Sequence, residues 1–457
     1  MLHRNRRFLP AMVLGALSVG GALALAADTA TEDLKAQVNA LQAKVEAMEA
    51  KQLSNKDVDD TVRRILADAD SRSQMFAAEG FTAGYSKGKF LIQSADGNFV
   101  LQPMLQFQLR YDAAYRDDGK STDAGVSGER DKTDDGFELR RMKFGFGGNA
   151  MTPDLTYLFV WATNRKADSA GEGAGVPVLE DAWTRYRFAP QWTVQGGQFK
   201  DPWSHTNVVS SKRYLAVDIS LLDHVLGDDQ TGYIQGVALG WQTDPLRAQL
   251  AFHDGASSAN TNFQDAKSDY GVTGRGEWKI MGDNWVEYED FSALGNKSDL
   301  LVAGIGADWT SGDTADILYH SADIQWEPQA IAGLSMYGSV IGRATNPTAD
   351  ASSTYDWGFL AQAGYMLTSK WEVFGRYDMT RFDQNGLASR ASIDTLHEIT
   401  TGVNYYINGH AAKFTADLTF LPSGTGGASS DGMGILPTSK TETNAEVVAR
   451  VQFQLLL

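Results

Sequence analysis

The stretch LQPMLQFQLRYDAAYRD, residues 101–117, alternates between apolar and polar side chains over a long run. Its odd positions are apolar: Leu101, Pro103, Leu105, Phe107, Leu109, Tyr111, Ala113 and Tyr115. Its even positions are mostly Gln, Arg and Asp. Successive side chains of a strand point to opposite faces, and an ordinary strand ends after about 5–6 residues. A strand this long with one apolar face is typical of a wall between lipid and water.

The same period of two returns along the chain after about Gly80. EITTGVNYYING (398–409) and AKFTADLTF (412–420) both alternate and are separated by an Asn-Gly turn, a strong hairpin signal. Sixteen to eighteen such segments can be counted, and bacterial outer-membrane barrels have an even number of strands. We therefore predict an all-β fold, a transmembrane antiparallel β-barrel of about sixteen strands over residues 80–457.

The connectors and the aromatic residues agree with this prediction. Short connectors at 152–154, 189–191 and 368–370 contrast with long polar ones at 117–135 and 423–443, as in outer-membrane barrels. Aromatic residues near the predicted strand ends indicate girdles at the lipid interfaces: Tyr111, Tyr115, Trp161, Trp183, Trp192, Trp371, Tyr405 and Tyr406. A water-soluble β-sandwich is the alternative, but it does not explain aromatic residues at the strand ends.

Two N-terminal segments precede the predicted barrel. MLHRNRR, a broken apolar stretch and Ala24-Leu25-Ala26 predict a signal peptide over 1–26, and hence export to the bacterial outer membrane; a membrane anchor is the alternative. Within 27–79, apolar residues spaced four and three apart predict a helix and a short coiled coil: Leu34, Val38, Leu41, Val45 and Met48. An amphipathic helix lying on its own domain is the alternative.

Composition excludes several function classes. The chain has no cysteine, which removes disulfides, thiol catalysis and cysteine metal sites. Its formal net charge of -17 argues against binding to nucleic acid. The seven histidines are scattered, and neither HExxH nor GxSxG occurs. We therefore expect no enzyme, no metal and no cofactor.

Several predicted strands carry basic residues on the face opposite the apolar one. Rings of basic side chains in a pore attract anions. The predicted pore-lining residues of an anion path are Arg110, Arg140, Arg141, Lys143, Arg185, Arg187, Lys200, Lys212, Arg213, Arg376 and Arg450. Carboxylates are predicted on the same inner face, so a lining of mixed charge stays open as the alternative: Asp112, Glu138, Glu372, Asp378, Asp417 and Glu446.

The connector GQFKDPWSHTNVVSSKRYLAVDISLLDHVLGDD, residues 197–229, is too apolar for a free surface loop. It is long enough to fold into the barrel and narrow the pore. Lys200, Lys212 and Arg213 would then lie near the constriction, opposed by Asp218 and Asp223. On this hypothesis, deletion of residues 206–222 raises the single-channel conductance.

At GFELRRMKFGFGG (136–148), GQFKDPWS…SSKRYL (197–215) and GVNYYINGHAAKFTADLTF (402–420), the chain resembles the phosphate-selective porin O and P family. The resemblance implies a sixteen-stranded trimeric outer-membrane channel that passes phosphate or polyphosphate along arginines and past lysines at a constriction. Arg140 and Arg141 match the paired arginines of the family, and residues 197–200 match its GQFK element. The chain departs from outer-membrane habit at its last residue, Leu457, where an aromatic residue is usual.

These observations predict a passive, water-filled channel for small anionic solutes, with phosphate or polyphosphate as the refinement. The expected partners are outer-membrane lipid, lipopolysaccharide and further copies of the chain in a homotrimer. A general, weakly selective or cation-preferring porin is the first alternative, and a structural envelope tether is the second.

Overall fold

The computed structural model describes residues 35–43, 63, 80–86, 89–116, 133–163, 176–227, 232–256, 258–262, 268–349, 351–386, 393–430, 432–436 and 444–457. The chain divides into two compact units, Met1–Gly80 and Phe81–Leu457. In the first unit, residues 35–43 are helical. The signal peptide and most of the coiled-coil segment lie outside the described residues, so both remain predictions. No helix in the described residues has the length and apolar character needed to cross a membrane.

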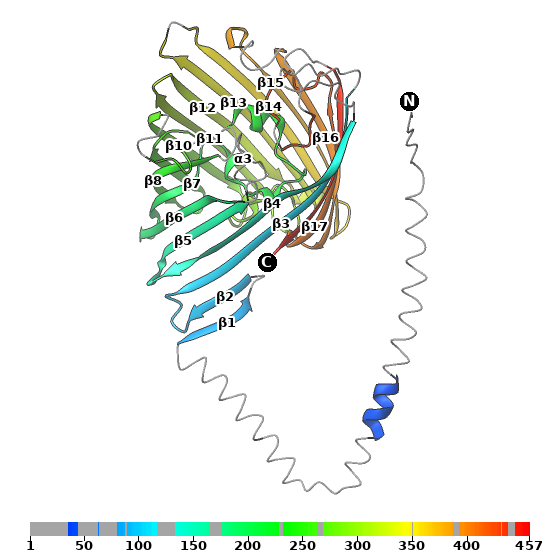
Figure 1. Ribbon diagram of the computed structural model, residues 1–457. Coiled ribbons are helices and arrows are strands. Elements are labelled where there is room, and N and C mark those ends of the chain that lie inside the picture. Colours follow the sequence, from blue (N-terminus) through cyan, green and yellow to red (C-terminus); the bar gives the residue numbers. More distant parts are fainter. Residues whose placement is uncertain are drawn as a thin grey trace, which may run out of the picture. The chain divides into compact units, whose positions relative to one another are not determined.

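The second unit is built around a ring of antiparallel strands (Figure 1). The strands of the ring are β3 (Val100–Arg116), β4 (Thr133–Ala150), β5 (Thr152–Thr163), β6 (Pro177–Ala189), β7 (Trp192–Lys200), β8 (Tyr233–Gln242), β9 (Leu246–His253), β10 (Ser268–Met281), β11 (Leu300–Gly312), β12 (Ala315–Glu327), β13 (Leu334–Pro347), β14 (Thr354–Met366), β15 (Trp371–Arg381), β16 (Thr395–Asn408), β17 (Ala412–Leu421) and β18 (Glu446–Leu456). Each strand pairs with the next one along the chain, and β18 pairs back onto β3 from Glu446↔Arg116 to Leu456↔Gln106. The described residues thus form a closed barrel of 16 strands, and this prediction is confirmed.

Two further strands, β1 (Phe81–Ser86) and β2 (Lys89–Ser94), form a hairpin outside the ring. β2 meets β3 only at Ile92↔Leu101 and Gln93↔Val100. The hairpin therefore adds to the edge of the wall and takes no part in closing the barrel.

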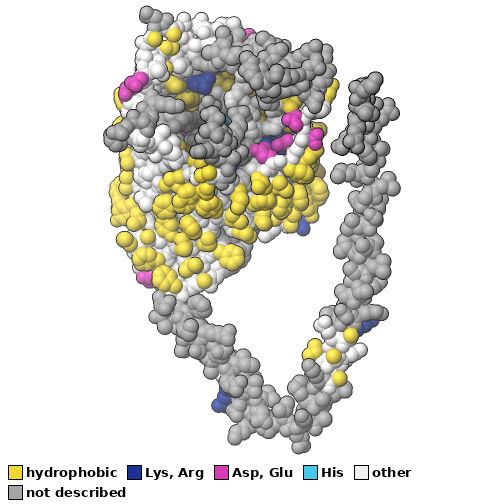
Figure 2. Space-filling view, in the orientation of Figure 1, with side chains coloured by type: hydrophobic (Ala, Val, Ile, Leu, Met, Phe, Trp, Pro, Cys, Tyr) yellow, Lys and Arg dark blue, Asp and Glu magenta, His cyan; other side chains and the backbone are white. Residues whose placement is uncertain are grey.

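The wall has an apolar outer face and a polar inner face, as the alternation predicts. On β16, Ile399 is 44% exposed whereas its neighbours Glu398 and Thr400 are each 1% exposed. Figure 2 shows apolar side chains gathered in a broad band over the visible face of the barrel. Such a band lets the outer face contact hydrocarbon.

Three details of the sequence prediction are wrong. Residues 152–154 belong to β5 and are not a connector, because the chain turns at Met151, which has a φ of 66°. Tyr406 is buried inside the barrel and donates a hydrogen bond of 2.5 Å to Glu372. Trp183 lies under the guanidinium of Arg185, 4.9 Å from its ring centroid, on the inner face. Neither ring belongs to an interfacial girdle, because each has a polar partner inside.

Parts of three connectors pack against the inner wall of the barrel. The first, residues 201–227, carries α3 (His205–Val208), η1 (Ser211–Arg213) and α4 (Leu221–Leu226), and Figure 1 shows α3 within the ring. The second, residues 282–299, carries η2 (Glu287–Glu289), and the third follows β17 over 422–436. The turns η3 (Gln329–Ile331) and η4 (Gln384–Gly386) lie in other connectors.

Apolar residues of these segments pack against apolar side chains of the inner wall. Leu215, Leu221, Leu222, Phe291 and Met433 join one buried cluster with wall residues such as Ile341, Leu360 and Phe374. The prediction that the connector over 197–229 enters the barrel therefore matches where residues 201–227 lie. The inner face is not uniformly polar, because the inward segments give apolar wall residues something to pack against.

A charge placed on the middle of the outer face tests the lipid-facing surface. Val451 is 50% exposed at the centre of β18. The substitution Val451→Arg should lower the free energy of unfolding by about 2–4 kcal/mol, because arginine at the bilayer midplane destabilises a barrel by that amount. Leu455→Arg, near the end of the same strand, should cost only about 0–1 kcal/mol. Denaturant titration in lipid vesicles measures both, and equal costs at the two positions would contradict the assignment.

Candidate functional site in the barrel lumen

Asp218 of the first inward segment lies where three arginines of the wall converge. Arg140 donates to Asp218 Oδ1 from Nη2 at 2.9 Å, and Arg141 donates to the same oxygen at 3.0 Å. Arg110 donates to Oδ2, and the Asp218 side chain is fully buried. Burial alone would raise the pKa of Asp218, but Arg140, Arg110 and Arg141 outweigh it and hold that pKa well below its usual range. Asp218 is therefore a carboxylate at every physiological pH.

A β-bulge brings Arg140 and Arg141 to the same face. In the register of β3 and β4, Gln108 pairs with Arg141 whereas Leu109 pairs with Leu139, which leaves Arg140 as the extra residue. A bulge inserts one residue and re-aims the side chains beside it. Two consecutive arginines can thus contact one carboxylate, although regular alternation would send them to opposite faces.

The start of α4 is held by a second group of charges, on β15 and β16. The backbone N–H of Leu221 donates to Glu398 Oε2 at 2.6 Å, and that of Leu222 donates to Asp378 Oδ1 at 3.2 Å. Arg376 donates to Glu398 at 2.6 Å and to the carbonyl of Asp218 at 2.8 Å. The first inward segment is therefore fixed to β15 and β16 at residues 218, 221 and 222.

Asp223 stands close to these carboxylates in the first turn of α4. Ser220 Oγ donates to Asp223 Oδ2 at 2.5 Å and accepts from the Asp223 backbone N–H at 3.0 Å. Burial raises the pKa of Asp223 to about 6, against the lowering effects of the Ser220 hydrogen bond and of Arg376. Asp223 thus changes charge near neutral pH.

The other two inward segments are also held by specific contacts. The ring of His205 stacks on that of Tyr288 with centroids 3.8 Å apart, which joins the first segment to the second. Arg450 pairs with Asp417 at 2.7 Å and donates to the carbonyl of Met433 at 2.9 Å, which holds the third. The interior is thus fixed by ion pairs and ring contacts as well as by apolar packing.

Charges of both signs are covered, and charges of both signs remain accessible to water. The carboxylates of Asp218, Asp417 and Glu446 are 0% exposed. Basic groups on β4, β6 and β9 are more open, with Lys143 at 18%, Arg247 at 24% and Arg187 at 54%. Accessible acids are present as well, and two of them are paired: Glu180 with Lys143 and Asp154 with Arg187. The accessible part of the inner wall therefore carries basic and acidic side chains together.

Arg185 on β6 differs from Lys143, Arg187 and Arg247, because no carboxylate of the described residues lies within ion-pair distance of it. Its Nε donates to Gln195 Oε1 at 2.8 Å, and its guanidinium lies 4.9 Å above the Trp183 ring. The partners that the structure shows for this side chain are thus an uncharged amide and an aromatic face. Glu289 of the second inward segment lies near enough to attract its charge without contacting it.

The structure separates the predicted pore-lining residues into two sets. One set is buried in contacts that hold inward segments: Arg110, Arg376 and Arg450. Lys200 is partly accessible but is engaged in the same way, because its Nζ donates to the carbonyls of Asn207 and Val209. The other set is at least partly accessible: Arg140, Arg141, Lys143, Arg185, Arg187, Lys212 and Arg213. Arg213 donates to the carbonyl of Glu289 at 3.3 Å, so it joins two inward segments.

Sequence reasoning missed Arg247 and Arg275. Arg247 lies 4.7 Å from the Trp285 ring centroid and pairs with Glu277, while Arg275 pairs with Asp323 at 2.9 Å. The sequence of β9 could have predicted Arg247. Leu250 and Phe252 are apolar and face outward, so alternation places the odd-numbered residues of this strand, including Arg247, on the inner face. Trp285 lies in the connector between β10 and β11, whose position cannot be predicted from strand alternation.

Asp201, His253 and Asp308 lie close enough together to be examined as a metal site. His253 Nδ1 accepts from the Gly255 backbone N–H at 3.1 Å, so a neutral ring carries its proton on Nε2. Nε2 lies 2.9 Å from Asp308 Oδ2 and 2.9 Å from Thr273 Oγ1. The geometry is that of a hydrogen-bonded histidine, and we assign no metal to it.

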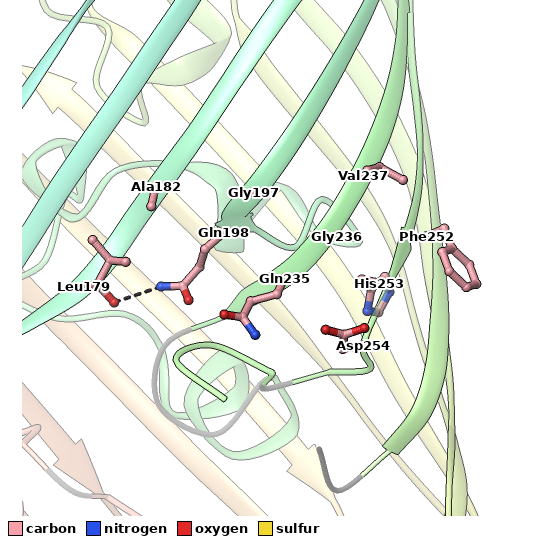
Figure 3. A pocket seen from close by; sticks show the side chains of 10 residues that line it. All are labelled: Leu179, Ala182, Gly197, Gln198, Gln235, Gly236, Val237, Phe252, His253 and Asp254. Carbon is pink, nitrogen blue, oxygen red and sulfur yellow. Dashed lines mark hydrogen bonds between the residues drawn. The ribbon is translucent and has the colours of Figure 1, made fainter. Parts of the chain in front are cut away.

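A pocket of ≈ 480 Å³ lies beside β6, β7, β8 and β9 (Figure 3). Gly197 and Gly236 pair across β7 and β8, and a Cβ at either position would meet the neighbouring backbone, at Ala182 O and Phe252 O. Gln198 donates to the Leu179 carbonyl at 2.9 Å. Its rim includes Val237 and Phe252, which belong to the outward apolar set. The pocket therefore gives no support to a lumenal binding site.

Removing the carboxylate of Asp218 tests how the first inward segment is held. Asp218→Asn should lower the free energy of unfolding by about 3–5 kcal/mol, because it leaves buried arginines without their counter-charge. Asp154→Asn breaks the exposed pair with Arg187 and should cost about 0–1 kcal/mol. Denaturant titration in vesicles measures the free energy of unfolding of both variants. Equal decreases would show that Asp218 does not hold the first inward segment in place.

The pKa of Asp223 predicts a pH dependence. Because its folded pKa of about 6 lies above the ordinary pKa of an aspartate, about 3.9, its contribution to stability is complete below about pH 4 and is lost as pH rises through 6. The loss amounts to about 3 kcal/mol. Asp223→Asn should therefore stabilise the barrel at pH 8 and not at pH 4. Thermal unfolding of both proteins across this range measures the difference, and a difference independent of pH would contradict the assignment.

Comparison with known proteins supports the architecture. Residues 109–281 match the family model described as phosphate-selective porin O and P. A curated uncharacterized protein of Aquifex aeolicus (strain VF5) is 21% identical over 278 residues, and the match covers 54% of this chain and 63% of that relative.

Two solved structures show the same fold at low identity. An anion-selective porin from Comamonas acidovorans has a TM-score of 0.52 at 12% identity, covering 78% of this chain and 99% of that one. The trimer form of OmpT, an outer membrane protein of Vibrio cholerae, has a TM-score of 0.50 at 9% identity, with the same coverage of both chains. The resemblance seen in the sequence is thus confirmed over residues 109–281, and the closed barrel has the fold of these two solved structures.

Proposed function

We propose that this protein is an outer-membrane channel for the passive diffusion of small anionic solutes. The observation that carries the proposal is the distribution of charge in the lumen. The carboxylates that face the inward segments are covered, whereas Arg185, Arg187, Lys143 and Arg247 are on the more open side. A solute in the open lumen therefore meets these basic groups, of which Lys143 and Arg187 are paired with acids whereas Arg185 contacts an amide and a ring.

The shape of the lumen strengthens this charge. Low-dielectric walls focus the field of the groups that line a cleft and raise the local concentration of the opposite ion. The pairs Lys143–Glu180 and Arg187–Asp154 are neutral overall. Arg185 contacts an uncharged amide, so it contributes more to the positive potential of the lumen than the paired residues do. We infer that Arg185 is the main determinant of anion preference, with Arg141 and Lys143 next to it on the path.

Phosphate or polyphosphate is the solute that we propose within this class. The description of the matching family model supports it, as do the planar, multiply donating guanidinium groups, which suit phosphate oxygens. We also propose a homotrimer embedded in lipid and lipopolysaccharide and exported by the predicted signal peptide. The trimer form of the Vibrio cholerae protein supports the assembly state.

A general porin of weak or cation preference is the second candidate. The accessible carboxylates of Glu138, Glu180 and Asp154 favour it, since each lies on the inner wall beside the basic groups. An envelope tether is the third, and the packing of inward segments against the inner wall favours it. Current and its selectivity separate the three candidates.

Reversal potential in a planar bilayer under a KCl gradient tests the proposal. The protein should be anion-selective and inhibited by added phosphate. Arg185→Gln should lower the anion preference by roughly threefold, since a unit charge about 6 Å from an ion in water contributes about 0.7 kcal/mol. Arg381→Gln is the matched control, because Arg381 lies at the end of β15 beside Asp394 and is half-exposed there.

Each other outcome points to one alternative. Cation-selective or unselective current that phosphate leaves untouched would indicate a general porin. An absence of current from folded protein would indicate the tether. An equal effect of the two substitutions would remove Arg185 from the path.

A further inference from the structure

The β1–β2 hairpin is a built extension of the wall. Its two strands pair completely, from Phe81↔Ser94 to Ser86↔Lys89. Its link to β3 consists of two register pairs, and the turn that follows β2 is held by Asn149, whose Nδ2 donates to the carbonyls of Gly97 and Asn98 at 2.9 Å each. The hairpin is therefore anchored to the barrel at the β2–β3 turn although it lies outside the ring (Figure 1).

The hairpin has one apolar and one more polar face. The pair Ala83↔Ile92 places Phe81, Ala83, Phe90 and Ile92 on one side of the hairpin. Thr82, Gly84 and Gln93 lie on the other side, together with Leu91. Phe81, Phe90 and Ile92 are 45%, 54% and 43% exposed. This degree of exposure is what the lipid-facing residues of the barrel show, and it is not that of a packed core.

The apolar face of the hairpin continues the outer face of the barrel. Ile92 pairs with Leu101, the first residue of the outward apolar row of β3. Residues directly opposite each other in an antiparallel pair point to the same side of a sheet. The lipid-facing surface therefore runs past the end of the ring and onto β2 and β1.

We propose that this face of the hairpin rests on the phospholipid leaflet at the end of the barrel where the short turns lie. This proposal depends on the outer-membrane location that we propose above. The turns at 190–191 and 243–245 and the C-terminal Leu457 mark that end, which faces the periplasm in outer-membrane barrels. Phenylalanine and isoleucine suit contact with the acyl chains just below the headgroups.

The free edge of the hairpin sets how deep it lies. Within the described residues, β1 pairs only with β2, so its other edge presents unpaired backbone groups. Unpaired backbone groups are too costly in the hydrocarbon core but are solvated at the interface. The hairpin therefore lies along the interface with its apolar face toward the chains and its polar face toward water.

A second copy of the chain fits this surface less well than lipid does. A stable interface between proteins buries about 800 Å² on each partner. Two strands of six residues each, with apolar side chains on one face, offer much less than that. Lipid, in contrast, already surrounds the apolar band that continues onto the hairpin, so it can cover this face without a second protein.

Site-directed spin labelling tests the proposal in the full chain, which has no cysteine of its own. Ile92→Cys places a label on the apolar face, and Gln93→Cys is the matched control on the other face of the same strand. In vesicles of phosphatidylethanolamine and phosphatidylglycerol, the label at 92 should be more accessible to oxygen than to a water-soluble nickel chelate. The ratio should reverse at 93. Ala83→Cys should repeat the result for 92 from β1.

Two outcomes would overturn the proposal. Equal access of the nickel chelate to positions 92 and 93 would place the hairpin in water. Protection of position 92 from both reagents would place it against protein, with a second copy as the partner. Conductance of the same labelled proteins reports the proposed channel function independently, so a failure of one proposal is distinguishable from a failure of the other.

Discussion

Every backbone N–H and C=O in a lipid-facing wall needs a partner from the protein, because hydrocarbon supplies none. The pairing of β18 with β3 meets this constraint by leaving no edge in the ring. Other features depend on it. Closure fixes which side chains face inward, and it creates an interior that the chain then fills with parts of its own connectors.

The interior combines two ways of holding those connectors. Apolar side chains such as Leu221 and Leu222 pack against the wall as they would in a soluble core. Asp218, Glu398 and Asp417 add charge pairs that specify where each segment lies. These pairs engage Arg110, Arg376 and Arg450, so the anion preference that we propose depends on side chains outside these pairs, Arg185 among them.

The fold could be predicted from the sequence because alternation reports the two environments of each strand directly. Residues 101–116, 398–408 and 412–420 lie in strands as expected. The interior could not be predicted as well. Ile341 and Phe374 face inward although they are apolar, and only the inward segments explain them. Arg110 and Arg450 were predicted on the correct face, but their burial depends on Asp218 and Met433, which are distant in sequence.

The bulge at Arg140 bears on how such a lumen can change over time. Substitution alone cannot set two neighbouring side chains of a regular strand on one face, because alternation separates them. An added residue can, and in β4 the register on either side of it stays intact from Tyr115↔Thr133 to Val100↔Asn149. A double positive charge at one height of the barrel is therefore reached by a one-residue insertion, which leaves the outward residues of both halves of the strand facing lipid.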